Sequence, residues 1–388
     1  MKKVLSKKEI AAILANSNLR KSLARENPMW FCLTYLRHHL NYPLAPFHLE
    51  MLHLIKNERH KFIAVMAFRE SGKSIIMNMA NILWSILGQP QKKFAVVVSK
   101  TQDQAKTHFG NLKEELMHNE LLRADFGPFA ENEREWNKTS LELFYHGSKI
   151  VSVSTEQGIR GMKYGALRPD LIVCDDIEDV SAAEDKSSRE ETLLRFSSEI
   201  LPLGSSGTRI FVLGNLISNE SLLMRLKKDI GEKNIDGIFR AYPIIDDERR
   251  ILWPEKYRNI ENVHKLSKRF PKVVWVREFL LKSLSANGHE LIRPIFLDDA
   301  FKREYGGEKK LPPKQIPLIP QMKEFSVSVP YDQAPLFLFM GDDLEYKLYF
   351  GNLHLDEPIM SGMERESFLK AKENKEKSKQ DVFGGKGL

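Results

Sequence analysis

The sequence predicts an α/β protein in which a mostly parallel central sheet lies between two layers of helices, a three-layer αβα arrangement. From about residue 61, short runs rich in β-branched and aromatic residues alternate with amphipathic segments of helical spacing. Parallel strands joined by crossover helices produce this alternation. Strands are expected at Phe62–Ala67, Phe94–Ser99, Leu171–Cys174 and Arg209–Leu213, a hairpin at Leu141–Ser154, and helices at Ser74–Leu87, Gln102–His118, Ser188–Ile200 and Glu220–Lys228.

The same pattern divides the chain into four parts. Residues 1–58 carry apolar positions at helical spacing and form a helical N-terminal lead-in, and residues 59–245 form the α/β core. Prolines interrupt residues 246–310, which we interpret as a connector. Residues 311–388 are expected to be a small C-terminal extension of unassigned fold with a charged tail, a candidate for the start of a truncated nuclease domain.

Composition narrows the functional class. The formal charge of +7 over 388 residues suits a polyanionic partner, but such a surplus also occurs in proteins that bind no nucleic acid. The two cysteines, Cys32 and Cys174, support neither a disulfide framework nor a cysteine metal cluster. The apolar runs are too short to span a membrane, and charges interrupt the first residues, so we expect an intracellular protein without a secretion signal.

A phosphate-binding loop is predicted at Ala67-Phe68-Arg69-Glu70-Ser71-Gly72-Lys73-Ser74, between an expected strand and an expected helix. Backbone N–H groups there would bind phosphate oxygens, Lys73 would neutralise the β- and γ-phosphate charge, and the Ser74 hydroxyl would ligate Mg²⁺. Ala67 stands where the standard pattern has its first glycine. The predicted ligands are therefore ATP and Mg²⁺.

A second motif, Leu171-Ile172-Val173-Cys174-Asp175-Asp176, is an apolar strand that ends in two carboxylates. Asp175 would hold the metal, and Asp176 would orient or deprotonate the attacking water, a task usually performed by glutamate. Glu178 is an alternative base, and an acidic turn at the strand end is an alternative interpretation of the whole group. A third polar strand end, Asn215, could sense hydrolysis or belong to an ordinary turn.

The order and spacing of five motifs resemble the large terminase subunit of tailed bacteriophages over roughly residues 40 to 285. The motifs are Pro46-Phe47-His48-Leu49-Glu50, Arg69-Glu70-Ser71-Gly72-Lys73-Ser74, Gly158-Ile159-Arg160-Gly161, Arg168-Pro169-Asp170-Leu171-Ile172-Val173-Cys174-Asp175-Asp176 and Leu213-Gly214-Asn215. The resemblance implies a P-loop NTPase fold of the ASCE type, ATPase activity and a role in packaging viral DNA.

The resemblance also implies roles for single residues. His48 would lie on the adenine side, and Arg69, characteristic of the family's phosphate loop, would act on the phosphates or on a neighbouring subunit. With Glu70, Ser71, Gly72, Lys73 and Ser74 these two residues make up the expected nucleotide-binding set. Asn215 would couple hydrolysis to movement. Arg160 could be an arginine finger for the adjacent subunit or an arginine that faces solvent or DNA.

The implied partners are double-stranded DNA held by backbone contacts, the portal protein, the terminase small subunit and further copies of the chain in a ring. The implied location is the host cytoplasm, transiently at the procapsid portal, with no membrane contact. The family usually continues into a two-metal nuclease. Residues 286–388 offer Asp332, Asp342 and Asp343 but no complete cluster, so we expect a separate or truncated nuclease.

Two other functional classes fit the same motifs. One is another DNA-translocating or helicase-like P-loop ATPase, although a helicase would show further arginine-bearing motifs after residue 245. The other is a degenerate, non-catalytic terminase-like assembly protein from a defective prophage. Ala67, Asp176 and the missing nuclease motifs keep this alternative open.

Overall fold

A computed structural model describes residues 12–129, 136–178, 185–246 and 250–282, together with the backbone of residues 325–326 and 337–338. Its core is a seven-stranded sheet with the strand order β3-β4-β2-β5-β6-β1-β7. The strands are β1 (Phe62–Ala67), β2 (Phe94–Ser99), β3 (Ser140–Leu143), β4 (Ser148–Ser154), β5 (Leu171–Asp175), β6 (Arg209–Gly214) and β7 (Gly237–Tyr242).

The sheet is mostly parallel, as predicted. Only the edge strand β3 runs antiparallel, and it pairs with β4 through the expected hairpin. Strand β1 lies between β6 and β7, and β5 lies between β6 and β2, so β1, β6 and β5 are consecutive neighbours. Since parallel strands present their carboxyl ends at one edge, the segments that follow these three strands meet there.

The four strands predicted in the core are confirmed, and β7 was missed. All residues of β1, β2 and β6 are buried, as expected of strands covered on both faces. Strand β7 begins at a glycine and carries Arg240, which interrupts its apolar run. The Arg240 Nε donates to Glu50 at 2.8 Å, and both side chains are buried, so pairing accounts for a charge inside the sheet layer.

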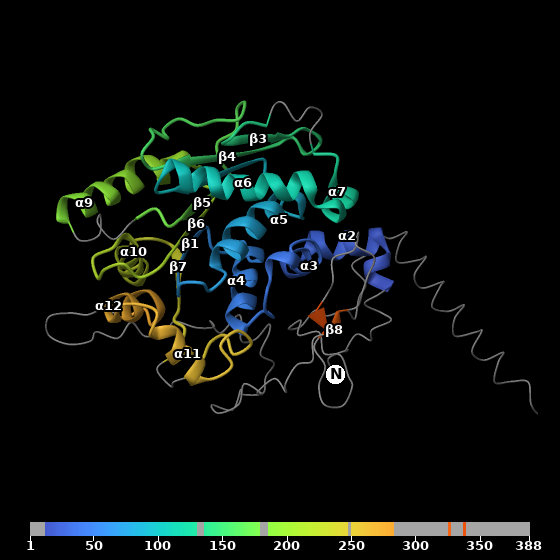
Figure 1. Cartoon of the computed structure of the whole chain (residues 1–388). Helices are drawn as coiled ribbons and strands as arrows, with labels where there is room; N and C mark the ends of the chain where they lie inside the picture. Colours follow the sequence, from blue (N-terminus) through green and yellow to red (C-terminus); the bar gives the residue numbers. More distant parts are fainter. Residues whose placement is uncertain are drawn as a thin grey trace, which may run out of the picture.

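Alternating residues of the sheet enter two hydrophobic clusters, one on each face. On one face lie α3 (Pro28–Tyr35), α4 (Pro46–Lys56), the π-helical segment η2 (Ser74–Ala80), α5 (Asn81–Leu87) and α6 (Gln102–His118). On the other lie α9 (Lys186–Arg195), η5 (Phe196–Ile200) and α10 (Leu222–Gly231). Figure 1 shows α9 and α10 at the left of the sheet and α3 toward the right. The predicted three-layer αβα fold is thus observed.

The remaining elements are shorter. They are α2 (Ser17–Glu26), η1 (Arg37–His39), α7 (Glu120–Phe126), η4 (Phe144–His146), η6 (Leu201–Leu203), α11 (Ile260–Ser267), α12 (Lys272–Val274), η7 (Trp275–Phe279), β8 (Phe325–Ser326) and β9 (Phe337–Leu338). The two-residue strands β8 and β9 pair with each other. The four-part division of the chain stays a prediction, and Asp332, Asp342 and Asp343 lie outside the described residues.

Buried Arg209 joins the N-terminal helices to the sheet. Its guanidinium donates to the backbone oxygens of Ile55 at 2.6 Å and of Leu54 at 2.8 Å, at the carboxyl end of α4. A cation at that end satisfies carbonyl groups that have no partner within the helix and complements the helix dipole. Helix α4 is therefore fixed relative to β6, which matters because α4 carries His48.

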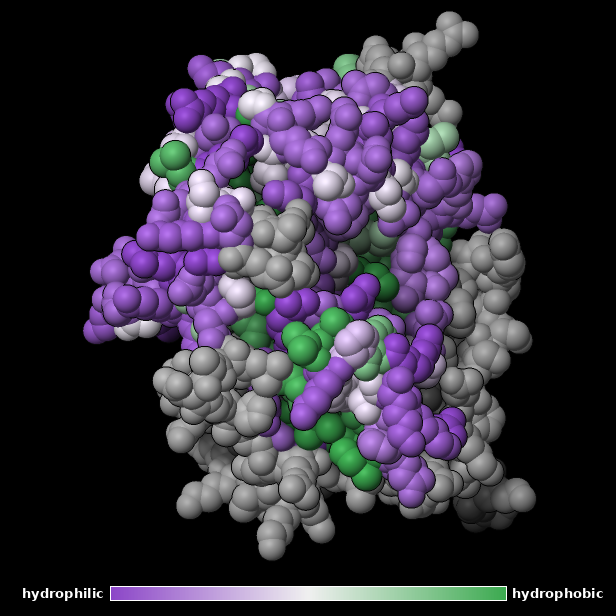
Figure 2. Space-filling model, turned by 60° about the vertical axis from the view of Figure 1, so that its left-hand side comes forward, coloured by the Kyte–Doolittle hydropathy of each residue, from purple (hydrophilic) through white to green (hydrophobic). Residues whose placement is uncertain are grey.

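The surface is mainly hydrophilic on the side that Figure 2 brings forward, with hydrophobic side chains gathered in a smaller area near its lower centre. Among the described residues, the large hydrophobic residues with exposed fractions above one half are Phe144, Tyr145, Leu194, Ile260 and Val273. None of the described helices combines the length and the apolar character needed to cross a membrane.

Candidate nucleotide-binding site

The predicted phosphate loop connects β1 to η2, as the sequence indicated. Two of its residues have positive φ angles, Glu70 at 64° and Gly72 at 82°. At Gly72 a Cβ atom would lie 3.5 Å from the His48 Nε2, so space is adequate and backbone conformation is the reason for glycine. The loop continues into η2 with Lys73 in helical conformation, which directs the first N–H groups of the helix toward the carboxyl edge of the sheet.

Three predicted catalytic residues from three strand ends meet beyond this loop. The Lys73 Nζ donates to the Asn215 Oδ1 at 2.8 Å and lies 3.6 Å from the Asp176 Oδ2. Lys73 is buried, whereas the Asp176 side chain is 48% exposed. The lysine therefore bridges the ends of β5 and β6, at the position where a phosphate group bound to the loop would compete for its ammonium group.

Asp175 is the buried carboxylate of this group. Its Oδ2 accepts a hydrogen bond from the Asn78 Nδ2 at 3.1 Å and lies 3.5 Å from the His108 Nδ1. Its Oδ1 is buried and has no hydrogen-bond partner among the described residues. Asn78 lies one helical turn after Ser74, so Asp175 faces the first turns of η2. An unpartnered buried carboxylate oxygen fits a hard cation such as Mg²⁺, which binds oxygen ligands.

Asp176 has a left-handed backbone, with φ of 48°, and its N–H donates to the Leu213 carbonyl oxygen at 3.1 Å. Desolvation among the surrounding loops raises the pKa of the Asp176 carboxyl; Lys73 opposes that shift and Asp175 adds to it. At Gly214, close to Asp176, an added Cβ atom would lie 2.9 Å from the Leu223 Cδ1, so the Leu223 side chain would have to shift, and 3.5 Å from the Asp176 Oδ1, which is an ordinary contact distance.

Glu178, the alternative base, has a different position. It is buried, and its Oε2 accepts the backbone N–H of Leu222 at 2.9 Å, at the start of α10. A carboxylate at a helix N-terminus satisfies a backbone donor and complements the helix dipole. The contact of Asp176 with Lys73, together with this capping contact of Glu178, favours Asp176 as the carboxylate that would face the phosphates.

His48 of α4 contacts the phosphate loop through a hydrogen bond. Its Nδ1 accepts the Ala45 N–H at 2.9 Å, so the proton lies on Nε2, which donates to the Ser71 carbonyl oxygen at 2.6 Å. Burial lowers the pKa of His48 to about 3; the bond to Ser71 opposes that shift, and the charge of Lys256 adds to it. The ring packs edge-on against Trp253, with centroids 4.5 Å apart. His48 is thus a neutral side chain that connects α4 to the phosphate loop.

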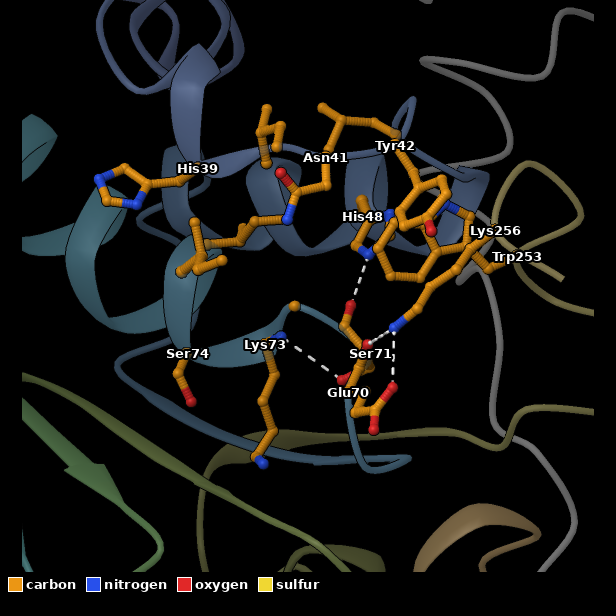
Figure 3. Close-up of a pocket in the computed structure, with 15 residues that line it drawn as sticks. His39, Asn41, Tyr42, His48, Glu70, Ser71, Lys73, Ser74, Trp253 and Lys256 are labelled. Carbon is orange, nitrogen blue, oxygen red and sulfur yellow. Dashed lines mark hydrogen bonds and ion pairs between the residues drawn. The ribbon is translucent and has the colours of Figure 1, made fainter. Parts of the chain in front are cut away.

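A cavity of about 300 Å³ opens beside the loop, on the side away from the Lys73 ammonium group (Figure 3). Its lining combines the loop with three other segments of the chain. The lining residues are His39, Leu40, Asn41, Tyr42, Leu44, His48, Glu70, Ser71, Gly72, Lys73, Ser74, Ile75, Ile76, Trp253 and Lys256. Aromatic walls, an amide and a loop that can bind phosphates suit a nucleotide base and its sugar.

Two charged side chains of the loop, Arg69 and Glu70, contact residues far along the chain. The Arg69 Nη1 donates to the Glu278 Oε2 at 2.8 Å, and the Arg69 N–H donates to the Glu278 carbonyl oxygen at 2.9 Å. The Lys256 Nζ donates to the Glu70 carbonyl oxygen at 2.9 Å and lies 3.2 Å from its carboxylate. In this conformation, therefore, Arg69 and Glu70 contact the segment 250–282.

Within one chain, Arg160 does not contact Lys73, Asp176 or Asn215 in any interaction described above. Its side chain is 69% exposed and lies 3.6 Å from Glu199 and 3.5 Å from the Ser198 hydroxyl, both in η5. An exposed arginine at this position is compatible with either of the two roles considered from the sequence. Its role stays a prediction.

The structure thus brings most of the predicted site residues to one region, and it adds residues that the sequence analysis missed. Asn78 follows Ser74 by four residues, so helical spacing could have identified it. His108, which lies beside Asp175, and Trp253, Lys256 and Glu278, which lie beside the loop, carry no comparable signal, because only the fold brings them to the site.

Comparison with known proteins gave matches among solved structures only. The large terminase of bacteriophage HK97 matches with a TM-score of 0.45 and 14% identity, over 67% of this chain and 54% of that chain. A Thermus phage large terminase ATPase domain matches with a TM-score of 0.42 and 17% identity, over 66% and 97%. A large terminase from a thermophilic bacteriophage in complex with ATP-gamma-S matches with a TM-score of 0.40 and 13% identity, over 61% and 52%.

All three are large terminases of bacteriophages. This is the family that the sequence motifs resemble. The chain spans about half the length of the HK97 protein and of the terminase bound to ATP-gamma-S, and nearly all of the isolated ATPase domain. No protein-family model and no curated protein matches the sequence.

Proposed function

We propose that this chain is an ATP-hydrolysing motor of viral DNA packaging, a terminase large subunit that translocates double-stranded DNA into a procapsid. The observation that carries the ATPase part is the meeting of Lys73, Asp176 and Asn215, which come from the ends of three neighbouring strands. The DNA-packaging part rests on the order of the five motifs in the sequence.

In this proposal the loop binds the phosphates of ATP, and Lys73 and Arg69 stabilise their charge. Ser74 and Asp175 would hold Mg²⁺, which when bound neutralises part of the charge on the β- and γ-phosphates. Asp176 orients the attacking water and accepts its proton.

Asn215 would couple nucleotide state to movement. The Lys73 ammonium group donates to the Asn215 amide oxygen at 2.8 Å. A bound γ-phosphate draws the ammonium group toward itself, so Asn215 loses its partner and the segment after β6 is released. The grip on DNA would use mainly phosphate contacts and would therefore depend on salt rather than on sequence. Arg160 would act in a neighbouring subunit of the ring, with the portal protein and the small subunit as further partners in the host cytoplasm.

The test measures Mg²⁺-dependent ATP hydrolysis by the full chain, with and without double-stranded DNA and empty procapsids. Lys73→Ala should lower turnover at least about 100-fold, because charge stabilisation at the transferring phosphate is lost. Lys106→Ala is the control, since Lys106 is an exposed residue of α6 that pairs with Asp103. Turnover that survives in Lys73→Ala would reject the proposed catalytic site at the phosphate loop. Turnover that is absent from the wild type while ATP still binds would reject the motor and favour a degenerate assembly protein.

A second pair of variants separates the two candidate carboxylates. Asp176→Asn should abolish turnover and preserve ATP binding, whereas Glu178→Gln should preserve turnover and lower thermal stability, because it weakens the cap on α10. The reverse pattern would show that Glu178 is the base. Stimulation by single-stranded but not by double-stranded DNA would favour a helicase-like ATPase.

A further inference from the structure

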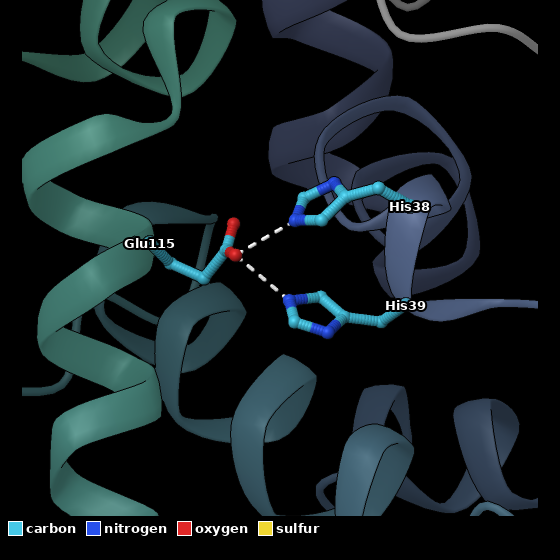
Figure 4. A group of neighbouring side chains, drawn as sticks. All are labelled: His38, His39 and Glu115. Carbon is cyan, nitrogen blue, oxygen red and sulfur yellow. Dashed lines mark hydrogen bonds and ion pairs between the residues drawn. The ribbon is translucent and has the colours of Figure 1, made fainter.

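Two adjacent histidines and a glutamate form a cluster outside the proposed catalytic group. His38 and His39 belong to η1, and Glu115 lies near the carboxyl end of α6. Both histidines direct Nε2 toward the same oxygen, Glu115 Oε1, at 2.7 Å each (Figure 4). The three possible ligand atoms lie within 4.8 Å of one another. Segments that are 76 residues apart in the sequence therefore present two imidazole nitrogens and a carboxylate oxygen at one point.

The glutamate is oriented by an anchored partner. The Asn119 Nδ2 donates to the Glu115 Oε2 at 2.8 Å and to the Tyr35 carbonyl oxygen at 2.6 Å. The Asn119 Oδ1 accepts the Leu122 N–H at 3.0 Å. Because Asn119 is fixed on both sides, it leaves the Glu115 Oε1 as the atom that faces the histidines. Hydrogen-bonded support of this kind positions metal ligands in proteins.

The cluster is buried on the carboxylate side and open on the histidine side. The Glu115 side chain is 7% exposed, and those of His39 and His38 are 28% and 52% exposed. Solvent can therefore reach the histidine side, where a fourth ligand could bind.

We propose that His38, His39 and Glu115 form a binding site for a divalent transition-metal ion of the Zn²⁺ class. Two imidazoles, one carboxylate and one water make a four-coordinate set that this ion accepts. Bonds of about 2.0–2.1 Å at tetrahedral angles separate ligand atoms by roughly 3.3 Å, so the histidines need to move outward by about half an ångström. Their exposure leaves room for that movement. Mg²⁺ prefers oxygen ligands, so this site is chemically distinct from the Asp175 group.

The position of the cluster gives such a site a structural consequence. A metal ion would link η1 to α6. Among the contacts described above, the hydrogen bonds of His38 and His39 with Glu115 are the ones that join these two elements. His39 also lines the cavity beside the phosphate loop, together with Asn41 and Tyr42. A bound ion would therefore fix the turn that forms one wall of the proposed nucleotide pocket.

The test uses Co²⁺ as a spectroscopic substitute for Zn²⁺, with purified full-length protein, Mg²⁺ in excess and no nucleotide. The wild type should bind one equivalent of Co²⁺ with the intense visible absorption of four-coordinate Co²⁺, and Zn²⁺ should displace it. His38→Gln and His39→Gln should each lower the affinity at least about 10-fold. His38 is exposed and His39 partly exposed, so both variants should fold, which a circular dichroism spectrum and a melting curve without metal would verify.

His118→Gln is the matched control. His118 pairs with Glu114 at 3.4 Å on the exposed face of the same helix, but it has no second histidine beside it. This variant should bind Co²⁺ like the wild type. Absence of four-coordinate Co²⁺ absorption in the wild type, or its persistence in both His38→Gln and His39→Gln, would overturn the proposal. Because no nucleotide is present, this result is independent of whether the chain hydrolyses ATP.

Discussion

Replacement of His48 by glutamine tests whether the imidazole that contacts the phosphate loop is neutral in the folded protein. Protonation of His48 would place a second proton on Nδ1, where the ring now accepts the Ala45 N–H at 2.9 Å. Folding therefore excludes the charged ring, and the pKa of His48 falls from 6.5 to about 3, chiefly through burial. Glutamine can still donate to the Ser71 carbonyl oxygen but does not titrate.

The expected change in the free energy of unfolding follows from proton linkage. A histidine with a lowered folded-state pKa binds fewer protons than the unfolded chain, so its contribution to stability is complete above pH 6.5 and is lost as the pH falls toward 3. Between pH 7.5 and pH 4.5 the relevant interval is 6.5 minus 4.5, which is 2 pH units. At 1.36 kcal/mol per unit, protonation linked to His48 alone should lower the stability of the wild type by about 3 kcal/mol.

Urea denaturation at both pH values measures this difference. His48→Gln should lose about 3 kcal/mol less stability than the wild type between pH 7.5 and pH 4.5. All other titrating groups are common to both proteins. The exposed His118→Gln should behave like the wild type. Equal losses in the wild type and His48→Gln, within about 0.5 kcal/mol, would refute a neutral, buried His48.

Two further substitutions test how the loop is held. Glu278→Gln frees the Arg69 guanidinium from a 2.8 Å contact; since this pair is partly exposed and contributes about 0.5–1 kcal/mol, the KM for ATP should fall about 2- to 5-fold. Glu261→Gln on α11 is its control, and an unchanged KM in Glu278→Gln would contradict the expectation. Gly72→Ala forces a side chain onto a φ of 82°, costs about 1–2 kcal/mol and should weaken ATP binding about 5- to 30-fold in a nucleotide titration. Gly110→Ala, in a helix with open space around it, should bind ATP normally, and equal affinities of the two variants would disprove backbone strain as the reason for Gly72.

The local sequence pattern was enough to predict much of the fold. Strands β1 and β2 have the predicted bounds, because each is a short, entirely buried apolar run that leaves no competing helical periodicity. Strand β7 escaped prediction, because its stability depends on pairing with β1 and on a partner for Arg240 rather than on its own pattern. The helix predicted from Ser74 forms, but its first seven residues are π-helical.

The sequence by itself determined the chemistry available to the site: the lysine and serine of the loop, the two carboxylates at the end of β5 and the amide after β6. These are local signals, because strand ends and loop conformations depend on residues close together in the chain. Only the tertiary structure decided which groups touch. The order of parallel strands brings Lys73, Asp176 and Asn215 together, and packing of distant segments places Glu278 on Arg69 and Glu115 between His38 and His39. Such contacts depend on three-dimensional distance, which is not encoded in the spacing of residues along the chain.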